Sequence, residues 1–488
     1  MSSANRTQIV LVRESTLGTT PTTPRMRTAR GTSVDPQYKA NFVDSDILRS
    51  DRMLNDPIKV MEEADLNFGF EQYFPVDNEP LSEIIRSAMF SAWVNTPTYD
   101  NDGTADSVVT DAGTTTDTYV VASGGASVVV GHLVRATGFT NSANNQVFRA
   151  ASSTGTTIVG SSLSLTAETA PPAAAKLKVV GFAGATADIT ASSTGLASTL
   201  LNFTTLGLAV GMWIKIGGTA AGDKFATAAL NSYARITAIA ANALTLDNRP
   251  TGWTTDAGTG KTIKVWFGDY IKNGTTKTGL SIEVGYLGQD TPTYILAAGQ
   301  IPNTLEWNIT SRQKITGSVA FMGMSGAQST TPQDASPDTA STAVVMAANA
   351  NVSRMSEAGA QLVSPNCARE ATFSINNNLR KLECVDDDAP IGINEGEFSV
   401  TGRANTYFGS NSLYAKFLAG TATAINSIAA KNGQAVIWDA PRVTYRSGSP
   451  NVTGKNTDTM LALDWQASIE TTYFNCSFII NRLEYLET

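Results

Sequence analysis

The residue types that most often carry out chemistry are scarce in this sequence. Its single histidine, His132, follows Gly131 in an apolar stretch. Catalytic triads and histidine-based zinc sites need an imidazole held by further polar partners, and most metal sites need several such ligands. We therefore expect His132 to be a surface or strand-edge side chain without a catalytic role.

Three cysteines, Cys367, Cys384 and Cys476, are too few and too widely spaced for a disulfide framework. Their number is odd, and no Cys-x-x-Cys pair indicates a zinc site. A free cysteine behaves as a small apolar residue and is commonly buried. The sequence therefore predicts three buried free thiols.

Carboxylates stand close together at three places. These are Asp44 with Asp46, Glu62 with Glu63, and the run 386–388. None of these spacings compels a mechanism. The run precedes an Ala-Pro pair and is typical of a solvated turn, because the calcium-binding loop pattern with its closing glutamate is missing.

One glycine-rich motif, residues 323–326, is similar to the nucleophile elbow of hydrolases. It lacks the full Gly-x-Ser-x-Gly pattern, and only His132 could serve as its base. No Gly-x-x-x-x-Gly-Lys-Ser/Thr loop for phosphate binding occurs either. We therefore predict that the protein is not an enzyme, and we assign no catalytic, cofactor-binding or metal-binding residues and no cofactor.

Composition sets further limits. The 488 residues carry 43 acidic and 35 basic side chains, a net charge of −8, so no overall positive field attracts the protein to a phosphate backbone. This disfavours proteins that read a DNA or RNA sequence. The N-terminus has no apolar run of signal-peptide length, and no stretch reaches the roughly 18 apolar residues that span a bilayer. We expect a cytoplasmic product without a membrane segment.

Charge is distributed unevenly along the chain. Residues 101–268 hold nine acidic and ten basic residues, and the remaining positions hold 34 acidic and 25 basic residues. The middle is rich in Ala, Ser, Thr and Gly and is therefore a separate compositional unit. The net acidity belongs to the framework on either side of it.

The middle unit contains an internal repeat. Three pairs of segments match, namely 128–135 with 208–215, 163–165 with 244–246, and 177–180 with 263–266. Each copy has short alternating apolar runs between Gly, Ser, Thr and Asn turns, which indicates a small β-module. We predict two inserted modules, 105–184 and 185–268, in a framework of residues 1–104 and 269–488. The insertion is expected to project outward as a decoration that the framework does not need.

The framework is predicted to be mainly β with one clear helix on its flank. This helix spans about 78–94, with Pro80 in its first turn and an apolar stripe of Leu81, Ile84, Ile85, Ala88, Met89, Ala92 and Trp93. A shorter helix is expected from Ser412 to a stop at Gly420. Strand patterns occur at 280–286, 304–310, 318–322, 371–375, 397–404, 435–438, 461–469 and 476–483. These strands would build a β-sandwich or barrel.

Two segments lack a packing pattern. Residues 1–56 contain only a brief strand at 8–12, and residues 325–364 are rich in Ala, Ser, Thr and Gln. We interpret them as a long arm and a loop that become ordered on meeting a neighbour. The arm carries two basic clusters, which are solvated or contact the acidic framework of a neighbouring subunit. They are Arg25, Arg27 and Arg30, and then Arg49 and Arg52.

Short motifs follow one another along the framework in a characteristic order. They are 12–21, 48–52 and the helix ending at Trp93, and after the insertion 281–286, 298–303, 317–323, 375–380, 400–402, 413–417 and 441–443. Their order resembles that of the tail tube (major tail) proteins of long, non-contractile-tailed bacteriophages, the siphophages, over about two thirds of the chain. The stretch 375–380 is the most specific. Residues 62–64 and 386–388 depart from the resemblance where glycine is common.

The resemblance implies a tail-tube β-sandwich whose subunits form hexameric rings, with strands from each subunit closing an inner barrel. Stacked rings would form a hollow tube that conducts DNA to the host without sequence-specific binding, and an acidic framework would let its lumen repel phosphates. The implied partners are further copies of the chain, the tape measure protein, the tail terminator and the distal tail proteins. The protein would be synthesised in the host cytoplasm and reside in the virion tail.

Two other functions stay open. A capsid or virion-surface decoration protein would share the β-modules and the lack of catalytic groups. A carbohydrate-binding adhesin would use Trp213, Trp253 and Trp266 of the insertion, although large aromatic residues are more often part of a core. Tube formation by the purified protein and glycan binding would distinguish these functions.

Overall fold

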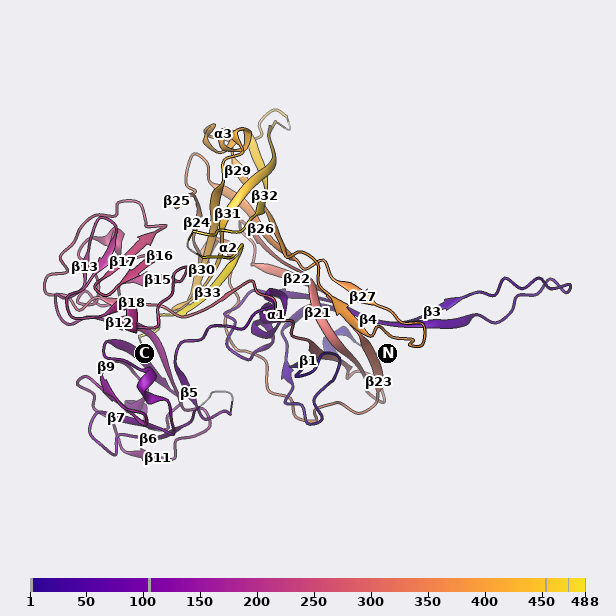
Figure 1. Cartoon of the computed structure of the whole chain (residues 1–488), viewed down its shortest axis with the longest axis horizontal. Helices are drawn as coiled ribbons and strands as arrows, with labels where there is room; N and C mark the ends of the chain where they lie inside the picture. Colours follow the sequence, from indigo (N-terminus) through magenta and orange to yellow (C-terminus); the bar gives the residue numbers. More distant parts are fainter. Residues whose placement is uncertain (1–2, 104–106, 453, 473, 488) are drawn as a thin grey trace.

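The computed structural model describes residues 3–103, 107–452, 454–472 and 474–487. The chain is mainly β, as predicted, with a 17-stranded sheet, a 14-stranded sheet and a separate two-stranded hairpin. Figure 1 shows a central framework, two lobes on one side of it, and a long hairpin that projects to the opposite side. The lobes hold the strands from β5 to β18 and are called the insert below.

The framework holds the large sheet, the small hairpin and three helices. The helices are α1 (Pro80–Met89), α2 (Ala348–Asn351) and α3 (Ser412–Ala419). The strands before the insert are β1 (Thr7–Arg13), β2 (Arg27–Thr28), β3 (Gly31–Val43) and β4 (Ile58–Glu71). The strands after it are β19 (Asp269–Lys272), β20 (Leu280–Tyr286), β21 (Thr293–Thr310), β22 (Thr316–Met322), β23 (Ser325–Ser329), β24 (Val352–Glu357), β25 (Ala360–Gln361), β26 (Ala368–Asn376), β27 (Arg380–Leu382), β28 (Gly392–Asn394), β29 (Ser399–Tyr407), β30 (Thr423–Lys431), β31 (Gln434–Asn451), β32 (Met460–Ala467) and β33 (Ile479–Glu484).

Helix α1 forms where the apolar stripe predicts it, but it is shorter than predicted. All five stripe residues within the helix are buried in the framework core, namely Leu81, Ile84, Ile85, Ala88 and Met89. The helix ends at Met89 because Phe90 adopts a left-handed conformation with a φ of 48°, so the predicted range 78–94 is too long. Trp93 still packs on the helix, and its Nε1 donates to the Ser82 carbonyl at 3.2 Å.

The framework core is built from alternate residues of its strands. The second half of β21, together with β26 and β32, buries every second side chain and turns the others to the opposite face. Aromatic side chains contact one another at the centre of the core, namely Trp307, Phe373, Trp438, Trp465 and Phe478. This one-sided burial leaves the sheet with a polar outer face.

In the described residues, the insert is formed by fourteen short strands. They are β5 (Thr98–Asp100), β6 (Val109–Ala112), β7 (Thr118–Val121), β8 (His132–Thr137), β9 (Val147–Ser153), β10 (Thr157–Gly160), β11 (Glu168–Thr169), β12 (Lys176–Ala183), β13 (Thr190–Ala191), β14 (Gly195–Ala197), β15 (Trp213–Ile216), β16 (Tyr233–Ala240), β17 (Ala243–Asp247) and β18 (Lys264–Trp266).

The insert contains two copies of one module. Copy 1 has the strand order β6-β7-β10-β9-β8-β12, and copy 2 has the matching order β13-β14-β17-β16-β15-β18, with β12 paired to β18. A side-chain motif is also repeated, because the Asn145 and Asn231 Oδ1 atoms accept hydrogen bonds of 2.9 Å from Phe139 N–H and Phe225 N–H. The module is thus duplicated. The boundaries of the copies at 184 and 268 stay predictions, and the one between 104 and 105 lies outside the described residues.

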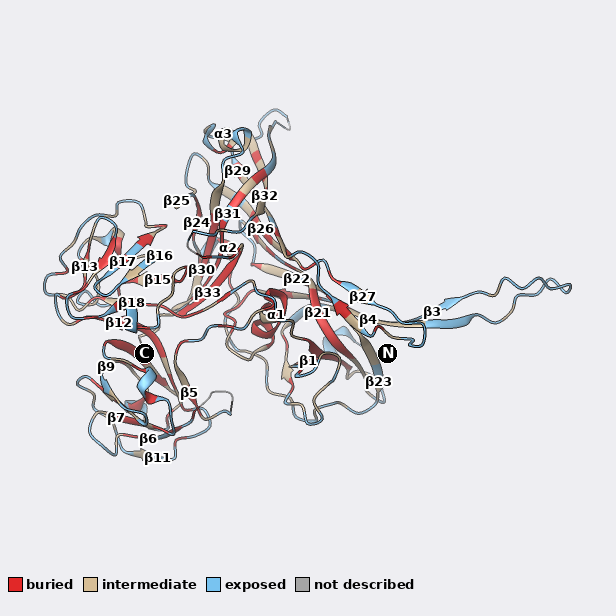
Figure 2. Ribbon diagram, viewed as in Figure 1, coloured by how far each residue is buried: buried red, intermediate tan, exposed pale blue. Residues whose placement is uncertain are grey.

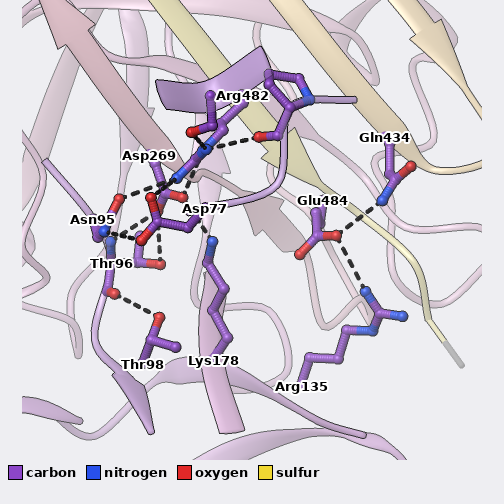
Figure 3. Close-up of polar contacts among 12 residues, drawn as sticks. Asp77, Asn95, Thr96, Thr98, Arg135, Lys178, Asp269, Gln434, Arg482 and Glu484 are labelled. Atoms are coloured by element: carbon purple, nitrogen blue, oxygen red, sulfur yellow. Dashed lines mark hydrogen bonds and ion pairs between the residues drawn. The ribbon is translucent and has the colours of Figure 1, made fainter. Parts of the chain in front are cut away.

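Buried ion pairs tie the insert to the framework (Figure 3). Asp269 at the start of β19 accepts from Lys178 Nζ of β12 at 2.7 Å and from Arg482 Nε of β33 at 2.8 Å. Nearby, Arg135 of β8 lies 3.6 Å from Glu484 of β33. That the framework does not need the insert stays a prediction, and these contacts argue against it.

The predicted arm and loop are more regular than expected. Residues 31–43 form β3, which pairs with β4 along its length, and residues 325–364 include β23, β24, β25 and α2. β3 was not predicted because none of its 13 residues is buried, so no apolar alternation marks the strand. The interpretation of residues 1–56 as a structureless arm is therefore wrong for this part.

Candidate functional site

His132 is buried, and the prediction of a surface or strand-edge position is wrong. Its Nδ1 accepts from Val129 N–H at 3.1 Å, which leaves Nε2 to donate to the Leu206 carbonyl at 3.2 Å. Burial lowers the pKa of this ring to about 4, so the imidazole is neutral at pH 7. Both ring nitrogens are thus engaged by the backbone and structural.

Only one of the three thiols behaves as predicted. All are free, but Cys367 and Cys384 are exposed and Cys476 is buried. The two exposed residues lie in loops, just before β26 and just after β27. Burial raises the pKa of Cys476 to about 12, so this thiol is protonated at neutral pH and is a core residue.

The acidic run and the glycine-rich motif do not assemble into a reactive centre. Residues 386–388 are exposed, and Lys59 Nζ lies 3.8 Å from the Asp388 carboxylate. Ser325 begins β23 of the framework, whereas His132 lies in the insert. Among the described residues, no group of three or more His, Cys, Asp or Glu side chains could hold a metal ion. No helix in the described part of the chain is long and apolar enough to cross a bilayer.

Two of the three tryptophans proposed for sugar binding are core residues. Trp213 and Trp266 are buried, and their Nε1 atoms donate to Asp439 at 2.8 Å and to the Gly217 carbonyl at 3.2 Å. Trp253 is half-buried, with its Nε1 bonded to the Ser192 carbonyl. The adhesin alternative therefore loses most of the aromatic surface on which it rests.

The basic clusters near the N-terminus make ion pairs inside the chain. Arg25 and Arg27 lie 2.9 and 3.3 Å from the Asp338 carboxylate, and Arg49 pairs with Asp51. The first pair of contacts fastens the 325–364 loop to β2. The expectation that these arginines are solvated or reach a neighbouring subunit is therefore wrong for Arg27, whereas the Arg25 side chain is about half exposed and agrees with it.

The outer face of the framework sheet, called the polar face below, is formed by five adjacent strands. β22, β21, β26, β29 and β32 pair in this order, and the side chains opposite the core share one surface. Hydroxyl and amide groups dominate it, namely Thr304, Asn308, Thr316, Ser318, Thr372, Ser374, Thr401, Asn405 and Gln466. Alternation of Ser and Thr with apolar residues at 371–376 is the sequence signal that could have revealed this surface.

Charges on the polar face are few. Glu306, Glu370 and Asp464 are acidic and Arg403 is basic, and Arg446 of the adjacent strand β31 borders the face. Arg403 Nε lies 3.4 Å from the Asp464 carboxylate, and both side chains are about half exposed. On the five strands, the three carboxylates outnumber the Arg403 guanidinium, so this surface has a small negative excess and offers no cationic track to a phosphate backbone.

The hairpin of β3 and β4 continues far beyond the framework body, and Figure 2 shows that its end is exposed. Residues 42–60, the projecting end of this hairpin, are called the arm below; this arm is a shorter segment than the arm of residues 1–56 predicted from the sequence. Leu48 and Leu54 are 99% and 92% exposed. The large apolar side chains that the arm exposes are Phe42, Val43, Ile47, Leu48, Met53, Leu54, Ile58 and Val60. Clustered exposure of this kind marks an interaction surface, and sequence reasoning missed it because the interspersed charges suggested a solvated segment.

The sheet that carries the polar face also has two open edges. Among the pairings of the described residues, β3 pairs with β4 alone, and residues 444–451 of β31 pair with β32 alone. Seven antiparallel pairings separate these edges, so β3 and β31 run in opposite directions. Open edges are places where a strand of another chain can add.

A comparison with protein families identifies one match. The model of a family described as phage tail tube protein matches residues 4–230 and 219–467, which together span most of the chain. No curated protein matches the chain significantly. The mainly β fold agrees with the family match and with the resemblance seen in the sequence. The chain therefore belongs to the phage tail tube protein family, whose members are structural components of the phage tail.

Proposed function

We propose that this protein polymerises as stacked hexameric rings into the hollow tail tube through which phage DNA reaches the host. The arm is the observation that carries this proposal. A folded single chain leaves eight large apolar side chains of the arm exposed to water, and full burial of each would contribute about 1.5–3 kcal/mol. Head-to-tail contacts between copies bury such a surface and repeat along a filament.

The open edges support ring closure by strand pairing. If β3 of one copy lies beside residues 444–451 of the next, the sheet continues from subunit to subunit as an antiparallel ladder and no edge stays open. Val34 and Tyr445, which lie on these two strands, already pack against the framework core. Continuing the sheet would therefore also continue the apolar layer beneath it.

The polar face supports a lumen lining. Its hydroxyl and amide groups and its small negative excess would let DNA pass without the strong attraction that a basic surface exerts. Reversing two charges, with Glu306→Lys and Asp464→Lys, should slow DNA ejection from virions while tubes still form. The control is Asp290→Lys in the exposed turn between β20 and β21. Equal ejection rates in wild-type virions, in the double variant and in the Asp290→Lys control would contradict the assignment of the polar face to the lumen.

The remaining roles come from the family and from the resemblance. The tape measure protein, the tail terminator and the distal tail proteins would be partners of the tube, and the subunit would be synthesised in the host cytoplasm before it enters the virion. None of these roles needs catalysis or a cofactor. Residues 105–184 and 185–268 would form two domains attached to framework parts 1–104 and 269–488.

Cryo-electron microscopy of the assembled protein, purified or in virions, tests the proposal. We expect rings in which the arm is covered by another copy, β3 lies next to residues 444–451 of a neighbour, and the polar face lines the channel. Virions in which the protein decorates the capsid as separate subunits would contradict tube formation. A channel lined by lysine and arginine would contradict the account of DNA passage.

A further inference from the structure

Because the module is duplicated, residues of copy 2 can be matched with residues at the same strand positions in copy 1. In copy 1, Leu133 of β8 stands opposite Arg149 of β9. In copy 2, Trp213 of β15 stands opposite Arg235 of β16. Because the strands occupy the same places in the two modules, these pairs can be compared directly.

In copy 2 the pair reaches into the framework. Arg235 Nη1 lies 3.1 and 2.9 Å from the two carboxylate oxygens of Asp439 on β31. Trp213 Nε1 donates to the same carboxylate at 2.8 Å. The Asp439 side chain is fully buried, so copy 2 supplies the donors that this charge needs. A second carboxylate, Asp247 of copy 2, lies 2.6 Å from Arg235 Nη2 and holds the guanidinium in place.

Apolar packing extends the same contact. Trp213 and Tyr233 of copy 2 form one buried cluster with Ile428, Ile437 and Leu483 of β30, β31 and β33. The neighbouring residues on these strands, Ala429, Val436, Trp438 and Ile480, point to the opposite side into the framework core. This part of the framework sheet is therefore buried on both faces, and copy 2 covers one of them.

In copy 1 the matched residues pack mainly within the insert. Arg149 Nε donates to the Ala183 carbonyl at 2.9 Å. Leu133 packs with Val180, Ala183 and Trp266 of the insert, and from the framework Tyr485 alone of the cluster's residues packs against them. The position that carries the framework contact in copy 2 thus serves internal packing in copy 1.

We propose that copy 2 is the outer layer of the framework and is required to hold β30 and β31, whereas copy 1, which contacts the framework through the Lys178–Asp269 and Arg135–Glu484 ion pairs, is not required to hold these two strands. The docking surface is Trp213 with Arg235, and its partner is the Asp439 face of the sheet. This role goes beyond tube formation, since it concerns the fold of each subunit. Removal of the whole insert would expose Ile428 and Ile437 and deprive Asp439 of its partners.

Hydrogen–deuterium exchange of the full chain tests this division of roles. Arg235→Met and Arg149→Met make the same change at matched positions. We expect Arg235→Met to raise amide exchange in peptides covering 425–440 at least tenfold, and Arg149→Met to leave these peptides at the wild-type rate. Trp213→Leu is the milder second variant, because leucine is the residue that copy 1 has at this position. It should raise the same exchange by a smaller factor.

A compensating change separates docking from general damage. Adding Asp439→Leu to Arg235→Met removes both charges and should recover most of the lost protection, since an apolar pair can replace a buried ion pair. Equal exchange of residues 425–440 in the Arg235 and Arg149 variants would overturn the proposal, as would wild-type exchange in Trp213→Leu. Exchange is measured on unassembled protein, so its outcome is independent of whether tubes form.

Discussion

Arg482 and Asp269 form a buried ion pair, with Arg482 Nε 2.8 Å from Asp269 Oδ2. The pair joins β33, the last strand of the chain, to β19, the strand by which the chain returns from the insert. Lys178 of copy 1 donates to the same oxygen at 2.7 Å. Burial opposes ionisation of Asp269, but Lys178 and Arg482 outweigh it and hold the pKa of this carboxyl below its ordinary value. One carboxylate thus fixes three distant segments together.

Loss of this arginine should strongly destabilise the subunit. Arg482 also donates to the Pro75 carbonyl at 2.7 Å and to Ser82 Oγ at 2.9 Å. Arg482→Met leaves these acceptors and Asp269 buried with fewer donors, so we expect the free energy of unfolding to fall by about 3–5 kcal/mol. Urea unfolding measures this change in the free energy of unfolding. The control is Arg403→Met, which removes a half-exposed ion pair and should cost less than about 1 kcal/mol. Equal decreases in the free energy of unfolding for the two variants would show that the buried network stabilises the subunit no more than the exposed ion pair does.

His132 should make copy 1 sensitive to acid. Its pKa is about 4 in the folded protein against 6.5 in the unfolded chain, so the unfolded state binds the extra proton first. The contribution of neutral His132 to the free energy of unfolding is complete above about pH 6.5. It falls by up to about 3 kcal/mol as the pH falls toward 4. His132→Met should flatten this dependence, because Met212 occupies the matched position in copy 2 and its Sδ accepts from Ala209 N–H. The measurement is the free energy of unfolding from pH 4 to 7, and parallel curves for the two proteins would refute the prediction.

The cysteines should differ in reactivity. Cys367 and Cys384 are exposed, whereas Cys476 is buried and burial raises its pKa to about 12. Because the thiolate is the reactive form, a maleimide should label two thiols in the folded protein and three in denaturant. Mass spectrometry of the labelled peptides checks which residues react. Rapid labelling of Cys476 in the folded protein would mean that the loop before β33 opens readily.

Local patterns made part of this structure predictable. The stripe of α1 and the alternation at 371–375 report burial of one face of one element, and the structure confirms both. The repeat was visible because both copies keep the same order of apolar segments, although the offset between them rises from 80 to 86 residues along the module. Gly420, with a φ of 60°, ends α3 as predicted because glycine adopts this conformation without a steric penalty.

Contacts between distant segments were not predictable in this way. Arg235 and Asp439 are 204 positions apart, and in the sequence neither differs from a solvated charge. The burial of His132 depends on the Leu206 carbonyl of the other module. β3 has no buried residue, so no apolar alternation in the sequence marks it, and it is recognised as a strand only by its pairing with β4. The sequence therefore revealed the framework and the duplication, whereas the docking of the insert required the fold.

The arm should be needed for assembly and not for folding. Leu48 and Leu54 are almost fully exposed in the single chain, so Leu48→Ser with Leu54→Ser should leave its free energy of unfolding within about 0.5 kcal/mol of wild type. If a neighbouring copy buries both leucines, their loss removes about 3 kcal/mol or more of contact energy per subunit. Each 1.4 kcal/mol is about a tenfold change in an equilibrium constant, so the critical concentration for tube formation should rise about 100-fold. Sedimentation and electron microscopy over a concentration series measure it.

A matched substitution elsewhere decides whether the arm is special. Leu200 in copy 2 is 71% exposed and lies in a loop of the insert, so Leu200→Ser makes the same chemical change outside the arm. We expect this variant to assemble at the wild-type concentration. If the Leu200 variant fails as the arm variant does, general solubility and not a specific contact controls assembly. If the arm variant assembles normally, the apolar end of the hairpin serves another partner, and ring contacts must come from the open edges of β3 and β31 alone.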